Sequence, residues 1–290
     1  MITKIFELVI GIVLVLLGLF FASDALKTEF IGAGVIFLIV LFFSIIEDIL
    51  KNVQRAKLYW QILLLRLKNE NIRFSMSYLY IIRVDGEYLL VKNSNFDHYQ
   101  LVGGKYKRLR GTQQLLKDKF SAMDDEKLPD KPLMKHDYAL FIPAKNAIKF
   151  LNWFKHGHDR EINHWREFYE ELIQGKAKLL PQEVFPYVNY NHVKTITTPV
   201  KRSLGWDCHE ILQYDILEFL PTNSQLTELR KLKENGDTAY LKWADKELIT
   251  NLGYDKRTKE KLYTIGQHTK WAVNQKWSKE LFAVLLDNDK

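Results

Sequence analysis

The residues whose types and spacing most clearly suggest chemistry lie in the segment Arg166-Glu-Phe-Tyr-Glu-Glu171. On a helix, Glu167, Glu170 and Glu171 occupy positions i, i+3 and i+4, so three carboxylates project from one face. Like charges at this spacing repel one another, and Mg²⁺, which binds carboxylate oxygens and keeps waters for phosphate ligands, would relieve the repulsion. The segment predicts a magnesium site in which Arg166 neutralises or orients one carboxylate. A solvated helix face is the alternative that the segment alone leaves open.

A basic cluster follows a pair of glycines earlier in the chain. Flexible glycine backbone combined with cations is a pattern that holds phosphate groups. A solvated or membrane-facing surface explains the same cations, since an anionic leaflet attracts juxtamembrane lysine and arginine by ~1 kcal/mol each. The candidate ligand-binding residues are Gly103, Gly104, Lys105, Lys107, Arg108 and Arg110.

These side chains need a strand before the glycine pair and a helix beneath the carboxylates. Residues 78–84 and 87–92 are rich in aromatic and β-branched residues and are joined by the turn Asp85-Gly86. Asp159 is a suitable N-cap for a helix over 160–174 that stops at Gly175. Further extended segments are expected at 98–102, 136–142, 177–186, 188–198, 208–220 and 240–243. Further helices are expected at 112–120, 145–153, 226–234, 244–250 and within 265–286, with a loop at 121–131.

Strands and helices that are intermixed around one sheet indicate an α/β or an α+β fold, and α/β is the class predicted here. The order of strand, Gly-Gly, helix with Arg-Glu-Phe-x-Glu-Glu and further strands resembles the Nudix family. The family signature ends in Arg-Glu-U-x-Glu-Glu-x-Gly-U, where U is an apolar residue, and Gln100-Leu-Val-Gly-Gly-Lys105 is similar to its opening strand and glycines. The resemblance implies an α/β/α sandwich with a mixed sheet over residues 73–290.

The resemblance also assigns roles to the acidic residues. It implies that Glu170 and Glu171 ligate Mg²⁺, and that Glu167 is a further ligand or, in a hydrolase, the catalytic base oriented by Arg166. Glu210 is a weaker candidate for the additional downstream acid that many members have.

The chain departs from the Nudix signature at three places. About 50 residues separate Gly104 from the acidic helix, where the family has a short loop. His158 stands where the family has glutamate, and Ile173 stands where it has glycine. A signature with these changes is compatible with ligand binding without cleavage, and function must be argued from the site rather than from the fold.

Charge is distributed unevenly along the chain. The 290 residues include 42 basic and 35 acidic side chains, a formal net charge of +7, and one cysteine. Residues 1–50 hold two basic and five acidic side chains, so residues 51–290 carry 40 and 30, a net of +10. A single cysteine excludes a disulfide scaffold and any cysteine-rich zinc module.

Two apolar runs near the N-terminus predict a membrane hairpin. Residues 5–22 are apolar except for Glu7, residues 30–46 carry no charge, and a spanning helix needs ~20 residues. Residues 23–29 form a polar turn, so both ends of the hairpin lie on one side. Basic residues within 51–68 place that side in the cytoplasm, and the same segment is expected to be a helix suited to the headgroup region.

Three alternatives for the apolar runs are a cleaved signal peptide, a buried hairpin of a soluble protein and a passive anchor. Uninterrupted Leu, Ile, Val and Phe favour lipid as their solvent. Glu7 could face another helix or a water path, and Gly11, Gly18, Gly32 and Gly34 would permit close helix contacts.

The predicted domains are a two-helix transmembrane hairpin at 1–50, a basic juxtamembrane helix at 51–72 and a Nudix-like cytoplasmic domain at 73–290. This arrangement resembles the two-transmembrane Nudix effectors of bacterial antiphage systems of the CBASS class. The resemblance implies a two-pass protein of the bacterial inner membrane whose domain senses a cyclic oligonucleotide made by a neighbouring nucleotidyltransferase. It further implies a homo-oligomer that disrupts the membrane, and no binding to DNA or RNA duplexes.

Two other functions stay open at this point. One is a membrane-anchored, Mg²⁺-dependent Nudix pyrophosphohydrolase that cleaves a nucleoside diphosphate derivative. The other is a structural or adaptor protein with an inert Nudix fold. The altered signature weighs against an enzyme, so the sensor is the leading hypothesis.

Overall fold

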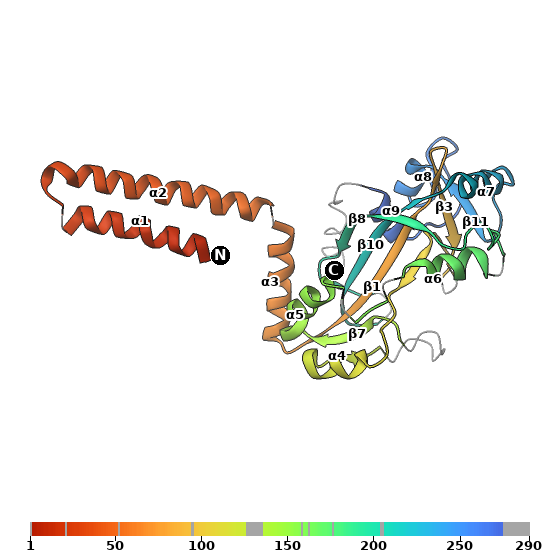
Figure 1. Cartoon of the computed structure of the whole chain (residues 1–290), viewed down its shortest axis with the longest axis horizontal. Helices are drawn as coiled ribbons and strands as arrows, with labels where there is room; N and C mark the ends of the chain where they lie inside the picture. Colours follow the sequence, from red (N-terminus) through yellow and green to blue (C-terminus); the bar gives the residue numbers. More distant parts are fainter. Residues whose placement is uncertain are drawn as a thin grey trace. The chain divides into compact units, whose positions relative to one another are not determined.

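The computed structural model describes residues 2–20, 22–51, 53–93, 96–125, 136–157, 159–161, 163–175, 177–203 and 206–274. The chain forms two compact units, Met1–Trp60 and Gln61–Lys290 (Figure 1). The first unit is helical, and the second contains every strand among the described residues.

Two helices form most of the first unit: α1, Ile2–Phe20, and α2, Asp24–Lys51 (Figure 1). The predicted polar turn at 23–29 is wrong in extent. Ser23 O accepts hydrogen bonds from the backbone of Leu26 and Lys27, both at 2.9 Å, so α2 begins immediately after it. Helix formation satisfies backbone groups that a polar turn would leave to water.

Small residues let α1 and α2 pack closely. A Cβ atom at Gly11 would lie 2.7 Å from Leu38, and one at Gly34 would lie 2.7 Å from Val15. Glycine at these positions allows the backbones to approach, which confirms their predicted role. The prediction is wrong for Gly32, where a Cβ would meet nothing within 4 Å.

The apolar side chains of α2 face outward within this unit. Ile36, Val40, Phe42 and Phe43 are each at least 60% exposed. Among the described residues, Leu26–Glu47 is the one helical stretch long and apolar enough to cross a membrane, while Glu7–Phe20 is a shorter apolar helix. The structure thus has one candidate membrane helix near the N-terminus.

Helix α3, Val53–Leu67, confirms the helix predicted within 51–68 and enters the second unit. Ile62 and Leu65, one turn apart, are buried there. The apolar residues of α3 that stay exposed beside them are Leu63, Leu64 and Leu67.

A seven-stranded mixed sheet forms the centre of the second unit (Figure 1). Its middle strand β1, Asn71–Ile81, pairs in parallel with β10, His209–Leu220, and antiparallel with β7, Ala139–Pro143. The order is β6-β7-β1-β10-β8, with β5 on β1 and β9 on β10. The remaining strands are β5 (Gly103–Lys105), β6 (Met123–Asp124), β8 (Asn189–Thr197) and β9 (Lys201–Arg202). This sheet confirms the predicted α/β class.

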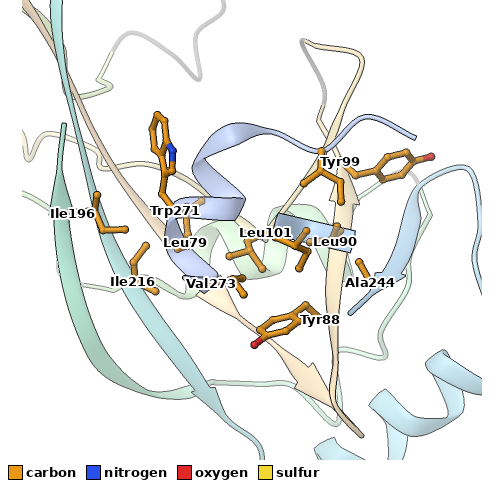
Figure 2. Packing of buried hydrophobic residues seen from close by; sticks show 13 residues of the cluster. Leu79, Tyr88, Leu90, Tyr99, Leu101, Ile196, Ile216, Ala244, Trp271 and Val273 are labelled. Carbon is orange, nitrogen blue, oxygen red and sulfur yellow. The ribbon is translucent and has the colours of Figure 1, made fainter. Parts of the chain in front are cut away.

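Two smaller sheets lie beside the central one. The first consists of β2 (Arg83–Val84), β3 (Glu87–Lys92), β4 (Tyr99–Gln100) and β11 (Leu241–Ala244). The second is the pair β12 (Tyr254–Asp255) and β13 (Glu260–Lys261). Figure 2 shows the apolar cluster that joins β1, β3, β11 and the final described helix α9, Gln267–Val273, with Leu79, Leu90 and Val273 among its members.

The strand register divides the central sheet into two faces. Alternate residues of a strand point to opposite faces, and partners in register point to the same face. Tyr78 is in register with Gly104 and Asp215. Their face, here the helix face, is covered by α5, Ala144–Lys155, and α6, Trp165–Phe168, because Phe74 and Tyr80 of β1 pack on Phe150 and Phe168.

The opposite face carries a different set of side chains. Ser77 is in register with Lys105 and Tyr214. The Tyr214 ring lies 6.3 Å from the Trp271 ring of α9. We call this side the α9 face.

Several predicted elements are confirmed and others are displaced. The helix at 112–120 is α4 (Thr112–Phe120), while α7 (Asn223–Glu234) and α8 (Lys246–Thr250) lie close to expectation. The first strand begins at Asn71 rather than at 78, because β10 and β7 pair with the two edges of its polar N-terminal half, and that half is buried. Residues 177–186 form turns rather than an extended segment. Parts of two predictions, 126–131 and 275–286, lie outside the described residues.

Candidate functional site

The acidic segment lies on a short helix packed on the helix face. Helix α6 runs directly into a π-helical turn, Tyr169–Ile173, in which Gln174 N donates to Tyr169 O at 2.8 Å. Single π turns inside helices are frequent at functional sites. The side chains that bury this segment against the domain are Phe168, Leu172 and Ile173.

The predicted helix over 160–174 is wrong at its start. Asp159 has a left-handed φ of 58°, and Glu161 N donates to Lys107 O at 2.8 Å. Residues 159–161 therefore pair with the segment that follows β5 rather than starting a helix, and Asp159 is no N-cap. His158, the residue at the glutamate position of the signature, lies outside the described residues.

Two of the three carboxylates contact the glycine pair. Gly103 N donates to Glu171 Oε2 at 2.9 Å. The Glu167 carboxylate lies against Gly104 so closely that a Cβ atom at 104 would overlap it. A Cβ atom at 104 would therefore force the Glu167 carboxylate, the end of a flexible side chain, to move. The structure joins the predicted glycine pair to the predicted acidic residues.

Arg166 is the cation of this acidic cluster. Its Nη1 lies 2.7 Å from Glu167 Oε1 and 3.2 Å from Glu170 Oε2. Its Nε and Nη2 donate to both oxygens of Glu161 at 2.9 and 3.2 Å, and Nη2 also donates to Lys105 O at 3.0 Å. Burial opposes the charge of Arg166, but the Glu161 hydrogen bonds and the Glu167 charge outweigh it and raise its pKa.

The surroundings of two carboxylates favour their neutral forms. Burial raises the pKa of Glu167, with Arg166 opposing and the charge of Glu170 adding to the effect. Burial also raises the pKa of Glu171 well above its usual range; the charge of Glu167 adds to this, and the Gly103 N–H opposes it. Close carboxylates with raised pKa values are a setting in which a bound cation relieves repulsion.

The observed positions do not match a magnesium site. Within the ranges that the structure describes, no three His, Cys, Asp or Glu side chains form a group that could hold a metal ion. The Glu170 side chain is 39% exposed and bonded to Arg166 Nη1, the same nitrogen that contacts Glu167. A cation shared by Glu167, Glu170 and Glu171 fits only if Arg166 moves, so that site stays a prediction.

Comparison with known families identifies the second unit. The family model described as the SMODS-associated NUDIX domain matches residues 71–273, from the first residue of β1 to the last residue of α9. The chain belongs to this family. No curated protein and no solved structure matches the chain. The match confirms the predicted Nudix resemblance of the domain.

The basic loop of this Nudix domain is largely paired with the domain's own acids. Lys107 forms an ion pair with Asp137, and Lys105 Nζ lies 3.8 Å from Asp137 Oδ2. Arg108 is buried, with its Nη1 2.7 Å from Asp124 Oδ1. The predicted phosphate cradle is therefore engaged in intramolecular ion pairs. The exposed member of the predicted cluster is Arg110.

Sequence reasoning missed a buried acid on the helix face of the Nudix domain. Asp215 Oδ2 accepts a hydrogen bond from the Tyr106 hydroxyl at 2.5 Å and lies 3.4 Å from Arg160 Nη1. Asp215 Oδ1 accepts from Thr195 Oγ1 at 2.6 Å. The available signal was the pair Gln213 and Asp215, two polar residues that share one face of the strand with Ile211, Leu217 and Phe219.

The Asp215 cluster extends to the half-buried His164. His164 Nε2 lies 2.9 Å from the Tyr106 hydroxyl, and its Nδ1 lies 2.7 Å from the Tyr190 hydroxyl. Because Tyr106 donates its proton to Asp215, Nε2 must donate to Tyr106, and neutral His164 accepts from Tyr190. Burial and the charge of Arg160 lower the pKa of His164 to about 4, which fits this neutral form.

The predicted downstream acid, Glu210, lies elsewhere. Its register partner is Arg73, so it belongs to the α9 face rather than to the face of the acidic turn. There it accepts from Arg73 at 2.9 Å and lies 3.3 Å from Lys201 Nζ. The extended segment predicted at 208–220 is confirmed as β10, but the sequence did not reveal which of its alternating residues face the acidic turn. Asp215 is the acid of β10 on that side.

Proposed function

We propose that this protein is a membrane effector of bacterial antiphage defence of the CBASS type, whose Nudix domain senses a cyclic oligonucleotide. The observation that carries the proposal is the presence, in one chain, of an outward-apolar N-terminal helix and a domain of the SMODS-associated NUDIX family. A sensor needs a ligand-binding domain tied to a part that acts, and these two units supply both.

The acidic turn supports sensing rather than cleavage. A Nudix hydrolase needs its carboxylates for a metal, whereas Arg166 here bonds to Glu161, Glu167 and Glu170. Carboxylates neutralised by an internal guanidinium stabilise the fold without requiring a cation. This arrangement supports retention of a bound nucleotide over its turnover.

The proposal includes a two-pass topology in the inner membrane. Helices α1 and α2 would both cross, with the N-terminus and residues 51–290 in the cytoplasm, because the basic residues that follow α2 favour that side. The outward apolar side chains of α2 would contact lipid and further copies of the chain. Ligand that binds an assembled state more tightly would shift the population toward a homo-oligomer that disrupts the membrane.

The functional partner under this proposal is a nucleotidyltransferase that makes the cyclic nucleotide. The link rests on the description of the family as SMODS-associated and on the architecture of the chain. Co-expression with and without such an enzyme would separate a ligand-triggered effector from a constitutive one.

The deciding experiment is calorimetric titration of the detergent-solubilised full chain with cyclic di-AMP, cyclic di-GMP, cyclic GMP–AMP and cyclic tri-AMP. Each titration is run with and without Mg²⁺, and the same samples are analysed for cleavage. We expect tight binding of at least one compound with no cleavage. Failure of every compound to bind would refute the sensor, and cleavage would make the protein an enzyme.

A second function, Mg²⁺-dependent pyrophosphohydrolysis, is favoured by one observation. Glu167 and Glu171 have raised pKa values and lie close enough to repel one another. This function predicts turnover of a nucleoside diphosphate derivative that disappears in Glu170→Gln or Glu171→Gln. Activity that survives in both variants would exclude it.

A further inference from the structure

The α9 face of the central sheet carries three hydroxyl groups that form no hydrogen bond with the described parts of the protein. Ser75 and Ser77 of β1 are only 7% and 8% exposed. Tyr214 of β10, which is partly exposed, lies beside Ser77 in register, and burial raises its pKa. None of the three hydroxyl oxygens is among the fully buried atoms without a partner in the described chain, so each keeps some accessible surface.

These hydroxyls are available to an external partner. A polar group that loses water without gaining another partner costs about 1–3 kcal/mol, so each of the three needs water or a ligand. Charged groups on the same face are paired within the protein: Arg73 bonds to Asp125 at 2.8 Å and to Glu210 at 2.9 Å. The fully buried hydroxyls of Tyr78 and Tyr80, which also have no partner, lie on the helix face instead.

Lys105 brings a positive charge to the same place. It is in register with Ser77 and so points to the α9 face. Its one ion pair among the described residues is long, 3.8 Å from Nζ to Asp137 Oδ2. Burial lowers the pKa of Lys105, and the charge of Arg73 adds to this although Asp137 opposes it. A bound anion near Lys105 would favour its charged form.

Helix α9 supplies aromatic rings at the edge of this group. His268 stacks on Tyr214 with ring centroids 5.7 Å apart, and Trp271 meets the same ring edge-on at 6.3 Å. Trp271 is itself a member of the buried apolar cluster that contains Leu79 and Val273 (Figure 2). Aromatic faces are suitable for stacking on a nucleobase.

We propose that Ser75, Ser77, Lys105 and Tyr214, here the hydroxyl group of the α9 face, bind a phosphodiester of the nucleotide ligand. One ammonium and three hydroxyl donors that converge on one side of a sheet match a group rich in charged oxygen acceptors. The inference rests on the proposed sensor function. It places the ligand-binding site on the α9 face, and Lys105 is the member that this group shares with the basic cluster predicted from the sequence.

The placement also accounts for binding without cleavage. Glu167 contacts Gly104 on the helix face, whereas Ser77 and Lys105 point to the other side of the same strands. A phosphodiester held by the hydroxyl group of the α9 face is separated from the acidic turn by the sheet. No carboxylate of that turn can reach it.

The test compares two double variants of the full chain with a matched control. Lys105→Met with Tyr214→Phe removes the charge and one hydroxyl at nearly constant volume, and Ser75→Ala with Ser77→Ala removes the other two hydroxyls. Lys261→Met with Tyr254→Phe makes the same chemical changes on the exposed β12–β13 pair, where the two residues are also in register. Near-ultraviolet circular dichroism verifies that each variant is folded.

Binding of the four cyclic nucleotides named above is measured by calorimetry. We expect each α9-face variant to lose about tenfold or more in affinity, since charge-assisted hydrogen bonds are the strong ones, and the control to bind like the wild type. Affinities within twofold of the wild type in both variants would overturn the inference alone and leave water as the partner of these hydroxyls. Absence of binding by the wild type itself would instead refute the sensor function, and this inference with it.

Discussion

At the scale of single residues, Glu171 is a carboxylate whose surroundings favour its neutral form. Its folded-state pKa lies above the ordinary value, so ionisation costs stability, and that cost grows as pH rises from the unfolded pKa of ~4.3 through the folded one. Glutamine keeps an oxygen that can accept from Gly103 N. We expect Glu171→Gln to be more stable than the wild type at pH 8.

The measurement is thermal unfolding of the full chain between pH 4 and 8, where the advantage of Glu171→Gln should shrink as pH falls. Glu170→Gln removes a more exposed carboxylate of the same segment and serves as the control. A variant less stable than the wild type at pH 8 would show that the charge of Glu171 is needed.

His164 predicts a second pH effect with the opposite sign. Its folded pKa of about 4 lies below the ordinary value of 6.5, so the unfolded chain binds more protons between these values and stability falls as pH drops through this window. The expected loss is roughly 1–2 kcal/mol at pH 5 after allowing for partial exposure. Urea unfolding at pH 7 and pH 5 should show a smaller difference in His164→Gln than in the wild type. An equal change in unfolding free energy between pH 7 and pH 5 in both proteins would contradict the lowered pKa of His164.

The chemical character of a local segment could be predicted from the sequence, but the contact partners of its side chains could not. The string from Arg166 to Glu171 identified the acidic turn, and Gly103 and Gly104 were correctly joined to it through the family resemblance. The bond between Tyr106 and Asp215 spans 109 positions, and nothing local specifies it. The ion pairs of Lys107 and Arg108 were missed for the same reason.

At the scale of elements, Gly104 of β5 leaves room for the Glu167 carboxylate of α6 to lie against the strand. A methyl group at 104 would overlap the Glu167 carboxylate. We expect Gly104→Ala to destabilise the domain by about 1–3 kcal/mol, the range for overpacking. In a Glu167→Ala background the same substitution should cost much less, because the clashing group is gone. Denaturant unfolding of the wild type, the two single variants and the double variant gives the coupling free energy between positions 104 and 167. Purely additive effects on the free energy of unfolding would exclude the contact between Gly104 and Glu167.

The helix pair α1 and α2 offers a comparison of two glycines on one helix. Gly34 contacts Val15 closely, whereas Gly32 has open space around it. We expect Gly34→Val to increase hydrogen–deuterium exchange in both helices of the detergent-solubilised chain several-fold, since it separates the backbones. Gly32→Val has the same propensity cost and should exchange like the wild type. Equal effects of the two substitutions would argue against the close packing.

The elements that sequence predicted best are those with a local pattern, such as α4 and β3. The start of the acidic helix was predicted wrongly because Asp159 matches the N-cap preference. The backbone bond between Glu161 and Lys107, which replaces the helix there, depends on a distant segment. The N-terminal half of β1 was not predicted, because Arg73 and Ser75 make it too polar to match a strand pattern. Burial of those polar residues is a tertiary effect, and it marks the place where we infer a ligand.

At the scale of the whole molecule, the apolar surface of α2 makes the membrane hypothesis testable. Ile36 and Val40 are 64% and 62% exposed and lie one turn apart. Arginine at a helix centre costs about 2.5–3.5 kcal/mol per residue in membrane insertion. We expect Ile36→Arg with Val40→Arg to release the protein from membranes during alkaline extraction, while Ile36→Leu with Val40→Leu stays bound. Membrane retention of the arginine variant would contradict a lipid-facing α2.

The parallel pairing of β1 with β10 has a consequence for biosynthesis. Arg73 and its partner Glu210 are 137 positions apart, so β1 leaves the ribosome long before the strand that completes its sheet. Long-range pairing of this kind is slow and keeps strand edges unpaired in the meantime. The apolar helices α1 and α2 emerge earlier still. Under the proposed function, partition of α1 and α2 into a bilayer would therefore be complete while the Nudix domain is still unfolded, and the nascent chain would be anchored before it could bind a nucleotide.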